Sequence, residues 1–162
     1  DGDIVGLDLG LWLNDLCVDA AVTVGVGTIS PQAKKLIDVT RDALYEGIAA
    51  VKHGVKTGDV GHAIQASVEK HGFSVVRDLA GHGVVYKVHE EPMILNFGKK
   101  GTGEILTAGM VIALEPMVNE GDWHVKIDKD GWGIKTADGK RSAHFEHTVV
   151  VTNERCEILT EI

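Results

Sequence analysis

The sequence has 162 residues, of which 44% are hydrophobic and 25% are charged, a composition that supports one folded domain with a sizeable core. The formal net charge of −8 is opposite to the basic surface that nucleic-acid binding requires, and no apolar run is long enough to span a bilayer, so we expect neither partner. Cys17 and Cys156 form no disulfide framework and indicate a reducing compartment, so we expect a cytoplasmic protein.

Residues 3–24 predict two β-strands that are joined by a turn near Leu13-Asn14-Asp15. Apolar residues alternate with small or polar residues, as in a half-buried strand, and Asp8 and Asp19 lie on the less apolar face. The expected apolar face consists of Val5, Leu7, Leu9, Leu11, Leu13, Val18, Ala20, Val22 and Val24.

The position of the turn decides how Asp8 and Asp19 lie relative to each other. A turn at Leu13-Asn14 places them directly opposite, a turn at Asn14-Asp15 makes them diagonal neighbours on one face, and a longer loop separates them. Neighbouring carboxylates repel each other unless a proton or a cation relieves the repulsion, and divalent cations prefer such oxygen ligands. Taken alone, the stretch is equally consistent with two solvated acids on an open face.

A repeat of this pattern strengthens the metal interpretation. Residues 2–8 run from a glycine through apolar residues to Asp8, and residues 109–115 run in the same way to Glu115. Residues 19–24 begin with an acid and continue with apolar residues, as do residues 146–151. A duplication about a pseudo-two-fold axis would bring four carboxylates together, and two divalent metals would resolve their repulsion.

The remaining elements follow in chain order. Ser30-Pro31 predicts the start of a helix that ends before Gly54, and Thr57 is the expected N-cap of a second helix that ends at Gly72. Strands are expected over residues 73–79, 93–97 and 110–115, a hairpin over residues 123–136, a long strand over residues 142–152 and an edge strand over residues 156–159. This mixture indicates an α+β fold with a mostly antiparallel sheet.

Four further side chains are candidates for the site. His82 lies between two glycines in an expected loop, where an imidazole is accessible to a metal. His89 either stabilises a developing oxyanion or pairs with a neighbouring glutamate at the surface. His144 lies two residues before Glu146 and can line the site. Trp132 is either a core residue of an edge strand or the wall of an apolar pocket.

These motifs resemble type I methionine aminopeptidases over essentially the whole chain. The resemblance rests on Asp8, Asp19, Gly81-His82-Gly83, Val88-His89-Glu90-Glu91-Pro92, Glu115-Pro116-Met117-Val118-Asn119 and Phe145-Glu146-His147-Thr148. It implies a pita-bread fold, with a pseudo-two-fold, curved and mostly antiparallel sheet covered by helices. It also implies that residues 1–162 form a single metallopeptidase domain that is short at the N-terminus relative to the family, whose further substrate-binding histidine lies upstream of the first metal-binding aspartate.

The resemblance further implies a ligand set for two divalent ions of cobalt, manganese, iron or zinc. Asp8 would bind one metal, His82 and Glu115 would bind the other, and Asp19 and Glu146 would bridge the two. A hydroxide between the metals would attack the scissile carbonyl.

The same resemblance implies the roles of the remaining site residues. Glu115 would transfer the proton, His89 would stabilise the tetrahedral intermediate, and Trp132 would form a wall of the methionine pocket. From its position before Glu146, and not from the resemblance, we also expect His144 to contact the substrate. The expected substrate is the N-terminus of a peptide or a nascent protein, at the ribosome, and we expect a monomer.

Two departures and two alternatives accompany this interpretation. Val88 replaces an aromatic residue of the family, and residues 83–88 differ from the glycine-containing run that the family prefers. Prolidases and proline aminopeptidases share the five ligands, but they carry glycine where this chain has Met117. The alternatives are therefore a peptidase that cleaves next to proline, and a non-catalytic binding protein with the same fold.

Overall fold

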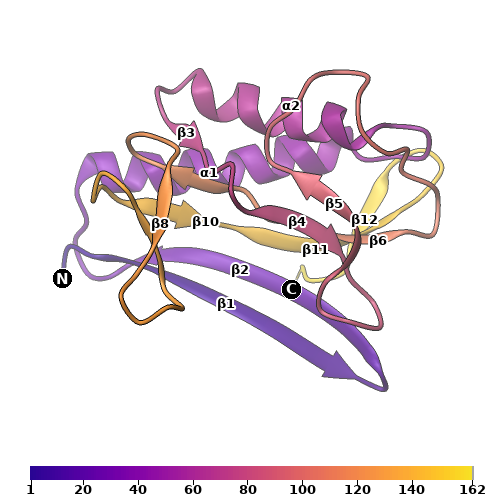
Figure 1. The fold of residues 1–162 in the computed structure, drawn as a ribbon, viewed down its shortest axis with the longest axis horizontal. Coiled ribbons are helices and arrows are strands. Elements are labelled where there is room, and N and C mark those ends of the chain that lie inside the picture. The colour runs from indigo at the N-terminus through magenta and orange to yellow at the C-terminus, as the bar shows by residue number, and fades with distance from the viewer. Residues whose placement is uncertain (162) are drawn as a thin grey trace.

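The chain alternates between strands and two helices in residues 1–161, the part that this computed structural model describes (Figure 1). The helices are α1 (Pro31–Ala50) and α2 (Thr57–Glu69). The strands are β1 (Ile4–Leu13), β2 (Leu16–Gly25), β3 (Ser74–Val75), β4 (Ala80–Gly83), β5 (Glu90–Leu95), β6 (Val111–Leu114), β7 (Met117–Asn119), β8 (Val125–Ile127), β9 (Ile134–Thr136), β10 (Ser142–His144), β11 (Glu146–Val151) and β12 (Cys156–Ile158). Neither helix of the described part is long and apolar enough to cross a membrane.

The largest sheet within residues 1–161 has seven strands, in the order β1-β2-β11-β6-β4-β5, with β12 paired to β11. Strands β10, β7 and β3 form a second sheet, and β8 and β9 form a separate hairpin. The pairings in both larger sheets are antiparallel. The sequence-based expectation of an α+β fold with a mostly antiparallel sheet is therefore confirmed.

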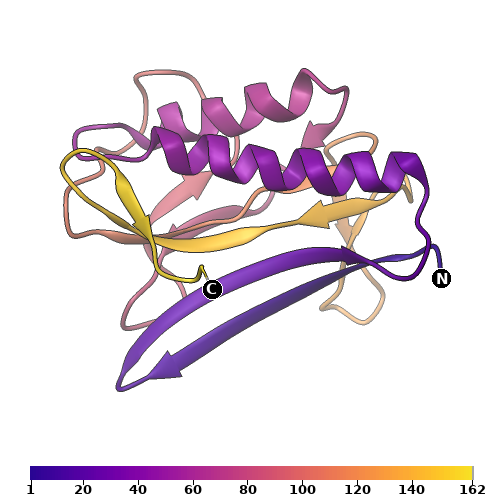
Figure 2. The same cartoon turned by 180° about the vertical axis from the view of Figure 1, so that it is seen from behind.

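Both helices lie on the same side of the large sheet (Figures 1 and 2). Helix α1 begins as expected, because the hydroxyl of Ser30 accepts a hydrogen bond from the Ala33 N–H at 3.1 Å and Pro31 occupies the first turn. Apolar side chains of the helices and the sheet form one core, which includes Leu36, Leu44, Ile64, Ile112, Leu114 and Val149. This core holds the central strands in place beneath the helices.

In hairpin β1–β2, strand β2 is buried on the face opposite to the expected one, whereas β1 is exposed on both faces. The predicted apolar face is in solvent, where Leu9 is 69% exposed and Leu11 is 58% exposed, whereas Cys17, Asp19, Ala21 and Thr23 on the opposite face are buried. The physical reason is that the helices cover the strands around β6 and β11, and the far end of the hairpin projects beyond them (Figures 1 and 2).

Two strand predictions are also wrong in ways that affect the site. Gly81-His82-Gly83 belongs to strand β4, not to a loop, because it pairs with both β5 and β6. The expected long strand over residues 142–152 is divided at Phe145, whose N–H donates to the Pro116 carbonyl at 3.4 Å. His82 therefore lies on a paired strand of the large sheet. His144 lies on β10 in the second sheet, whereas Glu146 lies on β11 in the large sheet.

The two repeated segments form adjacent parts of the large sheet. Strands β1 and β2 pair with each other, β6 and β11 pair with each other, and the inner strands β2 and β11 join the two pairs. Glu146 lies opposite Ala21, so the acidic residues of the inner strands are close. The arrangement agrees with the duplication that the sequence predicts.

Candidate metal centre

The four repeated acids gather on one face of the large sheet. Strand β1 supplies Asp8, β2 supplies Asp19, and β11 supplies Glu146, while Glu115 follows directly after β6. The turn of the first hairpin is at Asn14-Asp15, where both residues have positive φ, and Asp8 pairs with Ala21 while Gly10 pairs with Asp19. The two aspartates are therefore diagonal neighbours on one face, which is the second of the three arrangements considered.

The neighbours of His82 favour a neutral imidazole whose Nε2 lone pair can bind a metal. It is 8% exposed on β4, and its Nδ1 lies 3.0 Å from the Gly83 carbonyl oxygen, a pairing that requires the proton on Nδ1. The Nε2 lone pair is then free, and Nε2 lies 3.3 Å from Glu115 Oε1. Burial lowers the pKa of His82, which favours this neutral form further.

Asp19, His82 and Glu146 each offer a ligand atom, and these atoms all lie within 4.8 Å of one another. All three residues are buried, and Glu146 Oε1 has no hydrogen-bond partner within the described residues. The hydroxyl of Thr148 fixes the Asp19 backbone, because it accepts from the Asp19 N–H at 2.8 Å and donates to the Asp19 carbonyl at 2.7 Å. A buried, unpartnered carboxylate oxygen beside a free imidazole nitrogen fits a divalent cation.

The carboxyl groups repel one another strongly. Burial raises the pKa of Glu146 to about 9, with further contributions from the charges of Glu115, Asp19 and Asp8. Burial raises the pKa of Glu115 to about 8, and the charges of Asp8 and Asp19 add to this. The pKa of Asp19 is also raised, first by burial and then by Asp8. A positive ion among these groups reverses the repulsion, so the site is suited to cations.

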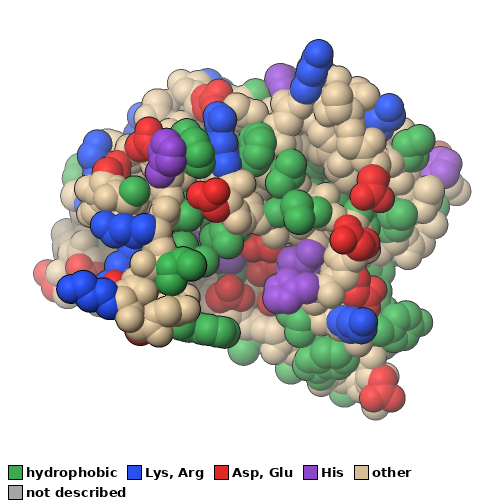
Figure 3. All heavy atoms as spheres, viewed as in Figure 1, with side chains coloured by type: hydrophobic (Ala, Val, Ile, Leu, Met, Phe, Trp, Pro, Cys, Tyr) green, Lys and Arg blue, Asp and Glu red, His purple; other side chains and the backbone are tan. Residues whose placement is uncertain are grey.

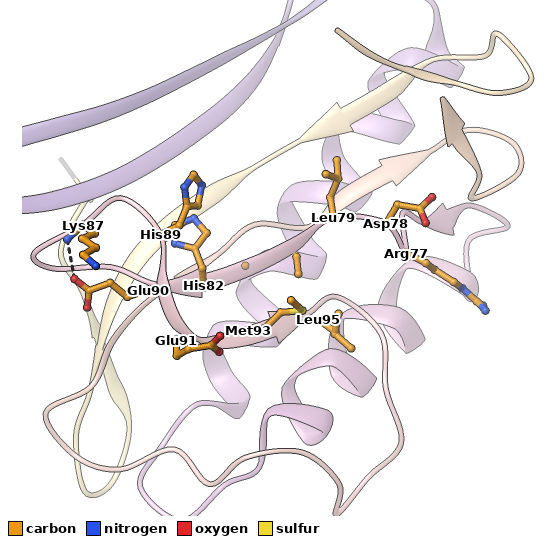
Figure 4. A pocket seen from close by; sticks show the side chains of 12 residues that line it. Arg77, Asp78, Leu79, His82, Lys87, His89, Glu90, Glu91, Met93 and Leu95 are labelled. Carbon is orange, nitrogen blue, oxygen red and sulfur yellow. Dashed lines mark hydrogen bonds between the residues drawn. The ribbon is translucent and has the colours of Figure 1, made fainter. Parts of the chain in front are cut away.

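A cavity of about 680 Å³ adjoins this centre. His82 and His89 lie side by side on its wall, with ring centroids 4.4 Å apart, and Arg77 lies away from them (Figure 4). Three apolar side chains, Leu79, Met93 and Leu95, also line the cavity. Its size is that of a small-ligand site. In the space-filling view, acidic and histidine side chains gather in a hollow of this face (Figure 3).

The structure places the other two candidates differently. His144 faces the acidic centre, with Nε2 3.6 Å from Glu115 Oε2 and Nδ1 3.9 Å from Asp8 Oδ2. Trp132 lies in the turn between β8 and β9, where it is 90% exposed, and it is not among the residues that line the cavity. The hairpin itself agrees with the sequence-based expectation.

Sequence reasoning missed the residues that support the site. The family motif includes Thr148 but gives it no role, although its place two positions after Glu146 on the same strand face is a signal for one. Asn96 was also missed, and its side-chain N–H donates to the Glu115 carbonyl at 3.1 Å. Leu79, Met93 and Leu95 carry no local signal, since only the folding of β4 against β5 brings them to the cavity.

Comparison with known proteins reveals close relatives. The methionine aminopeptidase of Clostridium perfringens is 51% identical over 162 residues, covering 100% of this chain and 65% of that protein. Methionine aminopeptidase 1 of Bacillus subtilis is 46% identical, again over 65% of its length. The crystal structure of the methionine aminopeptidase from Thermotoga maritima superposes with a TM-score of 0.98 at 49% identity, covering 100% of this chain and 65% of that chain.

The chain thus spans about two thirds of the length of these relatives. The superposition confirms the expected pita-bread fold. Residues 1–153 match the description of metallopeptidase family M24, and the described acids and His82 provide ligands of the kind that a metallopeptidase needs. The chain belongs to metallopeptidase family M24.

Proposed function

We propose that this chain is a metal-dependent aminopeptidase that releases N-terminal methionine from peptides and nascent proteins. One observation carries the proposal: the ligand atoms of Asp19, His82 and Glu146 converge within 4.8 Å beside a cavity, in a chain of family M24. We further propose that residues 1–162 act as a single domain, that the protein is a cytoplasmic monomer, and that its substrates include chains emerging from the ribosome.

The donor set fits two divalent ions, which we propose to be manganese, iron, cobalt or zinc. Asp8 would hold one ion, His82 and Glu115 the other, and Asp19 and Glu146 both. When bound, such ions lower the pKa of a coordinated water to about 7 and polarise the scissile carbonyl. Support comes from the unpartnered Oε1 of Glu146 and from the free Nε2 of His82, which both face this centre.

Glu115 and His89 are the proposed catalytic groups. Glu115 lies beside the proposed ions, with its Oε1 3.3 Å from His82 Nε2, so its carboxyl group is placed to take up and return a proton during the reaction. His89 is exposed on the cavity wall next to His82, where its ring nitrogens can donate a hydrogen bond to the carbonyl oxygen of a substrate. Both groups therefore lie close to His82, Glu115 through its Oε1 and His89 through its ring.

The cavity supplies the proposed substrate site. The side chains of Leu79, Met93 and Leu95 offer an apolar surface of the kind that a thioether side chain prefers. His144 and Trp132 remain proposed substrate contacts. Because Trp132 projects from the β8–β9 turn, it contacts a substrate only where the peptide extends beyond the cavity.

Release of methionine from the peptide Met-Ala-Ser tests the function. We expect activity that depends on added divalent metal and that falls by at least about a hundredfold in Glu146→Ala, because this substitution removes a shared ligand. Glu154→Ala, which removes an exposed acid in the bend after β11 and outside the proposed centre, should retain the activity. Metal-dependent release that persists in Glu146→Ala would contradict the proposed centre.

A panel of Met-Ala and Xaa-Pro peptides separates the two peptidase alternatives. The presence of Met117 after Glu115-Pro116 favours Met-Ala, since the proline-specific relatives carry glycine there. Preferential cleavage of Xaa-Pro would support the prolidase-type alternative. Tight metal binding without cleavage of any peptide would favour a binding protein with this fold.

A further inference from the structure

His144 lies between two carboxylates of the proposed centre but forms no hydrogen bond with either. Its Nε2 is buried and has no hydrogen-bond partner within the described residues. The nearest acidic oxygen to Nε2 is Oε2 of Glu115, at 3.6 Å, and Nδ1 lies 3.9 Å from Oδ2 of Asp8. A buried ring nitrogen next to an acceptor, just beyond bonding distance, indicates an interaction that forms with a small movement.

The backbone of His144 is held firmly in this position. The hydroxyl of Thr23 on β2 accepts from the His144 N–H at 2.8 Å and donates to the His144 carbonyl at 2.8 Å. On the other side, His144 pairs with Met117 of β7. Two strands therefore fix the backbone of His144, and from this position its imidazole lies between Asp8 and Glu115.

Glu115 has one oxygen available for each of two histidines. Its Oε1 lies 3.3 Å from His82 Nε2, which carries no proton when Nδ1 donates to the Gly83 carbonyl. This pair therefore presents two lone pairs, which only a cation or a proton can bridge. The second oxygen, Oε2, faces His144 and remains available for an ordinary N–H donor.

We propose that His144 is a positioning residue, which donates its Nε2–H to Glu115 Oε2 and so keeps Oε1 directed toward His82 and the cation. The inference deepens the proposed function, because the cation is that of the proposed aminopeptidase. Carboxylate ligands are commonly held by such hydrogen bonds, and loss of the outer partner lowers metal affinity by about 10- to 100-fold.

The test is a titration of the metal-free protein with Co²⁺, followed by calorimetry and by the visible absorption of the bound ion. His144→Phe keeps a ring but has no N–H donor, whereas His144→Gln keeps an N–H donor. We expect His144→Phe to weaken Co²⁺ binding by about 10- to 100-fold and His144→Gln to bind within about threefold of the unmodified protein. His144→Leu provides a second donor-free variant if His144→Phe does not fold.

Two outcomes would overturn the proposal. Unchanged Co²⁺ affinity in a folded, donor-free variant would show that His144 does not hold Glu115. Equal losses in His144→Gln and His144→Phe would show that the imidazole itself is needed, as for a direct ligand. The titration uses no peptide, so absence of methionine release from a protein with the expected Co²⁺ affinities would refute only the aminopeptidase proposal.

Discussion

Glu115 and Glu146 have environments in which a carboxylate is unfavourable without a cation. Both side chains lie among other acids, and burial is the largest cause of their raised pKa values, about 8 and about 9. Their ordinary pKa is 4.5, so near neutral pH each group binds a proton more tightly in the folded protein than in the unfolded chain. The two glutamates that would bind a metal therefore make the stability of the metal-free protein depend on pH.

The metal-free protein should lose stability as the pH rises. Because the folded-state pKa of each glutamate is raised, the associated stabilisation is complete below pH 4.5 and is lost as the pH passes through 8 and 9. Each group contributes up to about 1.4 kcal/mol per pH unit in the window between its two pKa values. Urea unfolding of metal-stripped protein at pH 6 and pH 9 measures the difference.

Glu146→Gln provides the matched control for this prediction, since the amide has nearly the same shape and does not titrate. The variant should show a flatter dependence of the unfolding free energy on pH than the unmodified protein. Equal slopes in the two proteins would mean that Glu146 is not the group that responds.

At the scale of elements, close contact between strands determines where His82 can lie. A side chain at Gly81 would overlap the carbonyl oxygen of Ala113 on β6, and one at Gly83 would overlap the carbonyl oxygen of Glu91 on β5. The glycines therefore allow β4 to lie between its two neighbours at normal sheet spacing. Their role is to permit this packing around a buried His82, more than to leave the imidazole open to solvent.

Gly81→Ala should destabilise the protein by about 1–3 kcal/mol, because its new methyl group would push β4 away from backbone atoms that cannot move independently. Metal affinity should fall with it, since His82 moves with the strand. Gly6→Ala on β1 is the control: a methyl group there meets no atom within 4 Å, and we expect a change below about 0.5 kcal/mol. Urea denaturation of both variants measures the effect, and equal stabilities would contradict this account.

At the scale of the whole molecule, the helical layer covers only part of the sheet. Within the described residues, the outer hairpin carries a row of exposed large apolar side chains, among them Leu7, Leu9, Leu11 and Leu13. Figure 3 shows hydrophobic side chains gathered toward the tip of this hairpin. Contiguous exposed apolar surface of this kind is uncommon on monomeric proteins.

This apolar row should bind hydrophobic dyes such as anilinonaphthalene sulfonate. The double substitution Leu9→Lys and Leu11→Lys should lower dye fluorescence, because it places two charges in the middle of the row. Ile105→Lys replaces an apolar side chain that is 53% exposed elsewhere, and it should leave most of the dye binding intact. If the double variant and Ile105→Lys reduce the fluorescence equally, the dye is not binding to the hairpin.

The sequence by itself determined the features that depend on local chemistry and on repetition. Ser30-Pro31 specifies a helix start through backbone capping, and the echo between Asp8 and Glu115 identifies the acids that meet in space. The family motifs identified the metallopeptidase family, because residue types at fixed spacing can be recognised without knowing how the side chains pack.

Only the tertiary structure decided which face of the first hairpin is buried, whether His82 lies in a loop or a strand, and where Trp132 and His144 point. Strand alternation defines two faces but does not say which one other elements will cover, so Leu9 and Asp19 exchanged their expected environments. In the same way, the division of the last long strand at Phe145 depends on a contact with Pro116, far along the chain. Burial and long-range pairing are properties of the assembled fold, and no local pattern encodes them.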